Sequence, residues 1–193
     1  SPEDQPRDVR MTRNLVLAGL TGLVGAAFLH IDIVLALPGW SGRDAFSRVV
    51  ALGETGQFYA LANEANPTGL ANEDPHIRSA VCRFDLSANP VRVTARVPVP
   101  LWTLAVFDTA SDEAYSMTDR SAIGQGVDIT LVTPAQMLQI RRDVPQALEQ
   151  SVLVEMSDTE GFVVIRAIVP DASGERAARN FLSEATCSPL VFG

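Results

Sequence analysis

The stretch that decides the fold is residues 91–107, VRVTARVPVPLWTLAVF. In its first part, 91–97, valine and alanine alternate with arginine and threonine, which is typical of an antiparallel strand with one face in water. The second part, 101–107, is almost entirely apolar and predicts a central strand that is covered on both faces. Together they predict a β-sheet at the centre of the domain.

Further β patterns lie on both sides of this stretch. Strands are expected at residues 58–61, 81–86, 114–117, 126–132, 151–156 and 162–169. The last two flank the polar segment 157–161, so we expect them to form a hairpin.

Helices are expected at residues 42–53, 134–144 and 174–186. Thr133 is the expected N-cap and Pro134 the first residue of the second of these helices. Its buried face is expected to carry Met137, Ile140 and Val144. Short connections between strands, with two helices late in the chain, indicate an α+β domain in which two or three helices pack on an antiparallel sheet. A β-sandwich with peripheral helices is the alternative.

Upstream of this domain, residues 15–37 read LVLAGLTGLVGAAFLHIDIVLAL. A helix of this length is about 34 Å long, enough to cross a hydrocarbon core of about 30 Å. The segment is too long for the apolar part of a signal peptide and too uniformly apolar for a core helix. We therefore expect a retained transmembrane helix that ends at Pro38-Gly39-Trp40, with the tryptophan at the headgroup interface.

The distribution of charge around this segment predicts its orientation. Three arginines precede it, Arg7, Arg10 and Arg13, whereas Arg43 and Arg48 follow it. This small excess favours a cytoplasmic N-terminus. The expected order is a cytoplasmic tail (1–14), a transmembrane helix (15–37), a membrane-proximal helix and connecting loop (38–78) and an extracytoplasmic domain (79–193).

The chain has two cysteines, Cys82 and Cys187, and both fall in the extracytoplasmic part. An even number of cysteines in an oxidising compartment predicts one disulfide. The alternative is a pair of unrelated buried thiols.

Two features of the apolar helix predict that it contacts another membrane helix. Ala18, Gly22 and Ala26 recur every four residues, and small residues at this spacing let a second helix approach closely. His30 and Asp32 are ionisable groups, which in a span usually face protein or water. The alternatives are that glycine and alanine are simply common in membrane helices and that Asp32 reaches the outer interface.

The composition excludes several classes of function. The 193 residues include 23 acids and 15 basic residues, all arginine, for a net charge of -8, so non-specific binding to nucleic acid is excluded. Nucleotide-binding glycine motifs and zinc-ligand spacings are absent from the sequence, and His76 is the one histidine of the domain. We expect no metal, no cofactor and no enzymatic activity.

The densest polar cluster follows the central apolar strand, a place where loops often carry function. The ligand or interaction candidates there are Trp102, Asp108, Tyr115, Asp119 and Arg120. The favoured alternative is structural: an aspartate pairs with Arg120 to fix a hairpin, and Tyr115 packs.

Arg166 interrupts the apolar strand at 162–169 and is a further candidate. We expect it on the same face as Val164 and Ile168. A buried guanidinium needs a carboxylate partner, and Asp108 and Asp119 are the candidates. A ligand carboxylate is the alternative partner.

Seven segments carry a resemblance to a known family: FLHIDIVLALPGW, RDAFSRVVALG, AVCRFDL, PLWTLAVFDTASDEAYSMTDRSA, TPAQMLQIRRDVPQALEQSVLVEM, GFVVIRAIVPD and ARNFLSEATC. From about residue 13 onward the sequence resembles domain of unknown function 1254 (DUF1254), in its short single-pass membrane branch from alphaproteobacteria. The resemblance implies a bacterial inner-membrane protein with a periplasmic β-rich domain. It also implies a separate membrane-anchored sister protein of the DUF1214 type as a partner, and it implies no activity.

Three functions follow from these observations. The first is an accessory or scaffolding subunit of an envelope complex, which rests on the features of the apolar helix. The second is an extracytoplasmic module that binds a small molecule, a lipid or a cell-wall fragment. A hydrolase ranks last, because Ser-His-Asp catalysis would depend on His76 alone.

Overall fold

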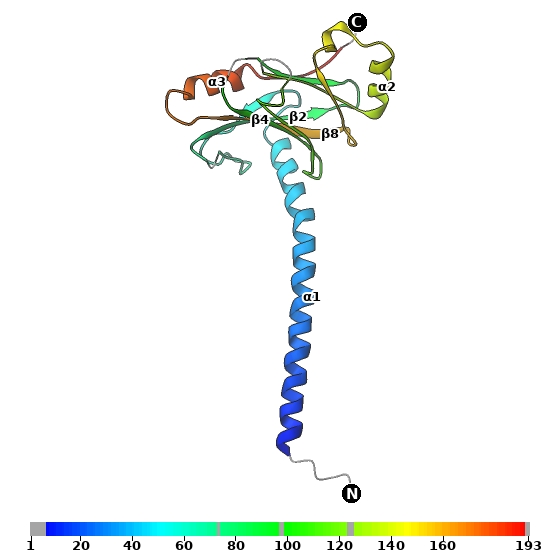
Figure 1. Ribbon diagram of the computed structural model, residues 1–193, viewed down its shortest axis with the longest axis vertical. Coiled ribbons are helices and arrows are strands. Elements are labelled where there is room, and N and C mark those ends of the chain that lie inside the picture. Colours follow the sequence, from blue (N-terminus) through cyan, green and yellow to red (C-terminus); the bar gives the residue numbers. More distant parts are fainter. Residues whose placement is uncertain (1–6, 73, 97–98, 123–125, 192–193) are drawn as a thin grey trace. The chain divides into compact units, whose positions relative to one another are not determined.

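The computed structural model describes residues 7–72, 74–96, 99–122 and 126–191. The chain forms two compact units, Ser1–Ser41 and Gly42–Gly193. The first contains most of one long helix, and the second contains two β-sheets and the shorter helices (Figure 1). The α+β class expected from the sequence is confirmed.

The long helix α1 runs from Arg7 to Val50. Its segment Arg10–Ala36 has 27 residues, and its most apolar 18-residue stretch has a mean hydropathy of 1.8 and is not buried. Leu23 and Leu35, for example, are 70% and 74% exposed. In length and composition this segment is able to cross a membrane, and a signal sequence would have the same properties.

The expectation that Pro38-Gly39-Trp40 ends the first helix is wrong. Helix α1 continues through these residues to Val50 and includes most of the separate helix expected at 42–53. A proline inside a helix removes one N–H donor and crowds the carbonyl four residues earlier, which can kink a helix without ending it. Composition alone does not distinguish a kink from an end.

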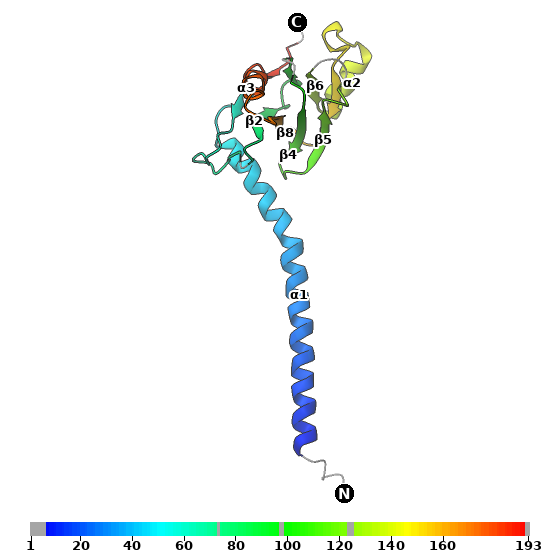
Figure 2. The ribbon, with the colours of Figure 1, turned by 60° about the vertical axis from the view of Figure 1, so that its left-hand side comes forward.

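The strands form two sheets (Figure 2). In spatial order, the first sheet consists of β1 (Phe58–Ala60), β2 (Ile77–Asp85), β8 (Glu160–Ile168), β4 (Trp102–Asp108) and β5 (Glu113–Thr118), and all its pairs are antiparallel. The second sheet consists of β7 (Val152–Glu155), β6 (Val127–Val132), β3 (Val91–Ala95) and β9 (Thr186–Pro189). The strands expected from the sequence are therefore present, with boundaries that differ by up to four residues.

The two sheets share one apolar core. Leu104 and Val106 of β4, in the first sheet, belong to the same buried cluster as Ile129 and Leu131 of β6, in the second. Val93 of β3 is fully buried in this cluster, as the alternation in 91–97 predicts. The domain is thus a two-sheet sandwich with helices, which was the alternative architecture, and not a single antiparallel sheet.

The hairpin expected from 151–156 and 162–169 is wrong. Strand β7 pairs in parallel with β6 in the second sheet, whereas β8 lies between β2 and β4 in the first. Helix α2 (Pro134–Arg142) separates β6 from β7 along the chain, and a parallel pair requires a connection of a dozen or more residues, usually through a helix. The short polar segment before β8 therefore passes from one sheet to the other.

Helix α2 (Pro134–Arg142) begins as expected, with Thr133 as its N-cap. The Thr133 side chain accepts from the Gln136 amide, and the Gln136 side chain accepts from the Thr133 amide at 2.9 Å, which completes a capping box. Met137 and Ile140 are buried, but Val144 lies beyond the helix end and is 50% exposed. Leu148, in the 3-10 helix η1 (Gln146–Leu148), fills the buried position instead.

Helix α3 (Glu175–Ser183) buries Ala178, Phe181 and Leu182 and leads into β9. Strand β9 brings Cys187 to Cys82 of β2, and the expected disulfide is confirmed, with 6.6 Å between the two Cα atoms. The bond joins the two sheets near one side of the sandwich.

Candidate binding groove

The residues predicted from the sequence as a site lie on different sides of the first sheet. Trp102 is 3% exposed and belongs to the core, where its ring lies 6.2 Å from that of Phe181. Tyr115 packs partly buried against the same core. In the sheet, Trp102 pairs with Ala167, the residue after Arg166. Because side chains alternate between the two faces along a strand, Arg166 points to the face opposite that of Trp102.

The segment from Asp108 to Arg120 contains β5, and its first residue has a structural role. One carboxylate oxygen of Asp108 accepts from the backbone amides of Ala110 and Asp112, both at 2.9 Å, and fixes the turn between β4 and β5. Ser111, in this turn, has a left-handed backbone with φ of 66°. Asp108 therefore stabilises the turn that joins these two strands.

The expected ion pairs of this region do not form among the described residues. Asp119 is half-buried and Arg120 is exposed, and no bridge joins them. Arg166 shares the face of Val164, as expected, but it has no carboxylate partner in the part of the chain that the structure describes. The structure therefore does not assemble these candidates into one site.

A different place holds a cavity with a volume of about 790 Å³. It lies where β1 at the edge of the first sheet, the end of α3 and β9 at the edge of the second sheet come together. We call this cavity the groove. Its apolar lining comes from Phe58, Leu61, Leu182 and Ala185, and Cys187 of the disulfide also contributes.

The residue Gly56, two positions before β1, lies close to β9 in the lining of the groove. Gly56, just before β1, has φ of 84°, a conformation that favours glycine. A Cβ atom at this position would lie 3.4 Å from the carbonyl oxygen of Cys187. Gly56 thus lets the two strand edges approach beside the disulfide.

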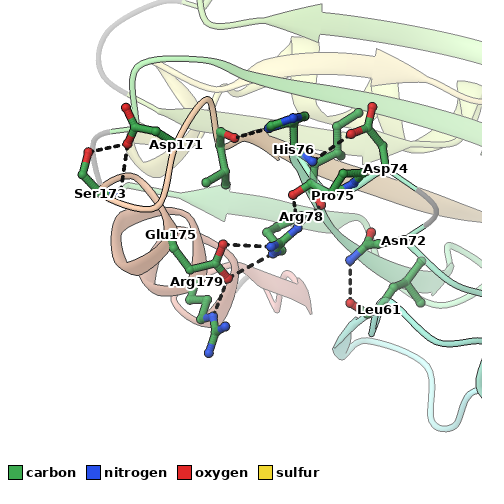
Figure 3. A network of polar contacts seen from close by, with 12 residues as sticks. Leu61, Asn72, Asp74, Pro75, His76, Arg78, Asp171, Ser173, Glu175 and Arg179 are labelled. Atoms are coloured by element: carbon green, nitrogen blue, oxygen red, sulfur yellow. Dashed lines mark hydrogen bonds and ion pairs between the residues drawn. The ribbon is translucent and has the colours of Figure 1, made fainter.

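The groove also carries a group of three charged side chains (Figure 3). Arg78, in β2, binds Glu175 of α3 through two bonds: Nε to Oε1 at 3.0 Å and Nη2 to Oε2 at 2.9 Å. Arg179, one helical turn further along α3, donates from Nε to the same Oε1 at 2.7 Å. Two guanidinium groups therefore share one carboxylate, and the cluster has a net charge of +1 within a chain of net charge -8.

The two arginines of this cluster differ in what they offer a ligand. Arg78 has a side chain that is 19% exposed, and its Nη1 also donates to the carbonyls of Pro75 and Ile77. Arg179 has a side chain that is 73% exposed, and only its Nε has a partner among the described residues. The hydrogen bonds from Arg78, and then those from Arg179, hold the pKa of Glu175 below its ordinary value. Glu175 therefore stays ionised, and Arg179 is the cation with donors to spare.

Neighbouring polar contacts fix the walls of the groove. Asn72 is 6% exposed. Its side-chain amide donates to the Leu61 carbonyl at 2.6 Å, and its backbone amide donates to the Ala62 carbonyl at 2.8 Å. Near the start of β2, the His76 ring contacts the Val169 carbonyl at 3.2 Å, and the His76 amide donates to Asp74 (Figure 3). The Asn72 contacts join the loop before β2 to the segment after β1, and the His76 ring joins the start of β2 to the end of β8.

Sequence reasoning missed Arg78, Glu175 and Arg179. The spacing of four between Glu175 and Arg179 indicates a helical ion pair, a feature of many solvated helices. Arg78 lies 97 residues before Glu175, and nothing local connects them. Among the described residues there is also no group of three or more His, Cys, Asp or Glu that could hold a metal ion.

The apolar helix carries its predicted residues on an uncovered surface. A Cβ atom at Gly22 would meet nothing within 4 Å, and Ala18, Ala26, His30 and Asp32 are all exposed. Their role in contacting a second helix stays a prediction.

Comparison with known proteins gives a fold but no function. No family model and no curated protein sequence matches the chain, so the resemblance to DUF1254 stays a prediction. The crystal structure of the VPA0106 protein from Vibrio parahaemolyticus is similar, with 14% identity and a TM-score of 0.58, over 79% of this chain and 36% of that one. A putative uncharacterized protein from Burkholderia cenocepacia aligns with 12% identity and a TM-score of 0.45, over 81% of this chain and 42% of that one. The chain thus spans about two fifths or less of the length of these neighbours.

Proposed function

We propose that this protein is a membrane-anchored accessory subunit of a bacterial envelope complex, with its sandwich domain in the periplasm. The observation that carries the proposal is the uncovered apolar segment Arg10–Ala36, followed in the same chain by a compact disulfide-bonded domain. Exposed apolar surface of this extent needs a covering, and a bilayer supplies one. The disulfide supports an oxidising compartment for the domain.

The partner in this proposal is a second membrane protein. The polar groups of His30 and Asp32 in the apolar segment need partners that lipid does not supply. A membrane-anchored sister protein of the DUF1214 type, which the resemblance to DUF1254 implies, is the candidate for this partner.

The test is purification of the tagged full chain in mild detergent, followed by mass spectrometry of the native assembly. We expect one membrane protein to co-purify at a fixed stoichiometry. A protein that runs as a clean monomer, from membranes in which it is expressed at its natural level, would contradict the accessory-subunit proposal.

The groove favours a second candidate, a binding module for a small molecule, a lipid or a cell-wall fragment. Its volume of about 790 Å³ lies within the range of ligand pockets, and it combines apolar walls with a cationic end. The same native mass spectrum distinguishes the two functions. A monomer that retains a small molecule supports the binding module, and a stoichiometric protein partner supports the accessory subunit.

A further inference from the structure

The groove is bordered by a strand edge with unused backbone hydrogen-bonding groups. In the part of the chain that the structure describes, strand β1 has one neighbour, β2. Tyr59 is in register with Val81, and the Leu61 amide donates to the Ser79 carbonyl at 2.9 Å. Successive residues of an antiparallel strand alternate between facing the partner strand and facing away from it. The N–H and C=O groups of Phe58 and Ala60 therefore point away from β2, and both residues line the groove.

A second strand borders the other side. Among the described residues, β9 pairs only with β3, and the Leu190 amide donates to the Pro90 carbonyl at 2.7 Å. By the same alternation, the backbone groups of Cys187 point away from β3, and its carbonyl lies beside Gly56. Thr186, Cys187 and Ser188 all line the groove, so β9 forms its second side, and the edge open to an extended chain is that of β1.

These features fit an extended peptide better than they fit an amphiphile. An acyl chain would use the apolar walls at Leu61 and Leu182 but would leave the donors and acceptors of β1 unpaired. A peptide strand satisfies them and can place alternate side chains against the same walls. The net charge of +1 at the Arg78–Glu175–Arg179 cluster, with the free donors of Arg179, favours an acidic side chain at that end.

We propose that the groove binds an extended segment of the partner protein, which adds as a strand to the free edge of β1 and places an acidic side chain beside Arg179. This inference rests on the proposed accessory function, because it requires a protein partner. It names the surface by which the periplasmic domain would hold that partner, independently of the apolar helix.

Two substitutions test the two halves of the proposal in the full chain. Ala60→Pro removes the amide that points into the groove while leaving the β1–β2 bonds of Tyr59 and Leu61, and proline is tolerated at strand edges. Arg179→Glu reverses the exposed charge. The matched control is Arg176→Glu, an exposed arginine of the same helix that does not line the groove. Formation of the Cys82–Cys187 bond and an unchanged thermal midpoint establish that each variant is folded.

The readout is recovery of the partner in mild detergent, together with hydrogen exchange of the complex and of the free chain. We expect Ala60→Pro, which removes a backbone hydrogen bond, and Arg179→Glu, which removes a charge-assisted one, each to weaken partner binding about tenfold. Arg176→Glu should bind like wild type. The Phe58 and Ala60 amides should exchange more slowly in the complex. If Ala60→Pro fails to fold, Arg179→Glu and the exchange data still decide the question.

Other results would contradict binding of the partner in the groove, and they differ from the result that would contradict the accessory function. A partner that co-purifies at wild-type stoichiometry with both groove variants, or amides that exchange equally fast in both states, places the contact elsewhere. A bound lipid or fatty acid that is lost on Arg179→Glu assigns the groove to an amphiphile instead. Absence of any co-purifying protein contradicts the accessory function itself.

Discussion

Glu175 is the residue that holds the charged end of the groove together. It is the first residue of α3, and it joins that helix to β2 through Arg78 while also engaging Arg179. Because the Arg179 side chain is 73% exposed, water screens its pair with Glu175, and the effect of that pair on overall stability is small. The main consequence of the two pairs is to fix the positions of two guanidinium groups.

The pH dependence of this cluster follows from Glu175. Its pKa is lowered from 4.5 in the folded protein, so the pairs stabilise the fold above the unfolded pKa near 4.5, and this stabilisation is lost as pH falls through the folded pKa. Glu175→Gln should remove this part of the acid sensitivity. Thermal unfolding between pH 6 and pH 3 measures the effect, and identical acid profiles for wild type and Glu175→Gln would contradict it.

The disulfide has a larger effect on stability. Replacing Cys82 and Cys187 together with serine frees a loop with a sequence separation of 105 residues. Loss of a native disulfide costs about 2–5 kcal/mol, so we expect a corresponding fall in the free energy of unfolding measured in denaturant. Non-reducing peptide mapping of wild type is the control, and alkylation of both wild-type thiols without reductant would contradict the bond.

At the scale of elements, the sequence predicts strands well and their partners poorly. The alternation of apolar and polar residues in 91–97 gives β3 and its buried face, because that pattern depends on neighbouring residues only. The sheet to which β7 belongs depends on the path of the chain through α2, and the polar segment 157–161 suited a hairpin equally well. The groove was not predictable for a similar reason, since Arg78 and Glu175 meet only when α3 packs on β2.

The apolar part of α1 is the element whose predicted role calls for a direct test. Gly22→Leu with Asp32→Leu fills the small-residue face and removes a polar group, while the helix remains apolar. We expect the variant to insert normally and to lose its partner in native gels. One hydrogen bond between membrane helices contributes about 1 kcal/mol to their association, so a single substitution is too weak to separate the partners and two are combined.

The control for this experiment is Val24→Leu, which changes volume on another side of the same helix. It should keep the partner. A double variant that inserts and still co-purifies at wild-type stoichiometry would show that the helix is an anchor only. Binding would then depend on the sandwich domain, where the groove variants give an independent measurement.

For the whole molecule, the proposed topology assigns each unit to a compartment. The arginines before the apolar segment favour a cytoplasmic N-terminus, and the disulfide favours an oxidising environment for residues 42–193. Alkaline phosphatase fused after Gly193 should therefore be active. A fluorescent protein that folds only in the cytoplasm, fused at the same position, should stay dark, and the reverse pair of results would contradict the topology.

The disulfide also sets an order on biosynthesis. Cys82 lies in the second strand and Cys187 in the ninth, so on this topology the first thiol is exported long before the second. During that interval Cys82 is open to mispairing with other thiols. The disulfide forms only when β9 has crossed the membrane. A chain whose export stops early therefore keeps a free thiol at Cys82, which distinguishes it from the complete, disulfide-bonded protein.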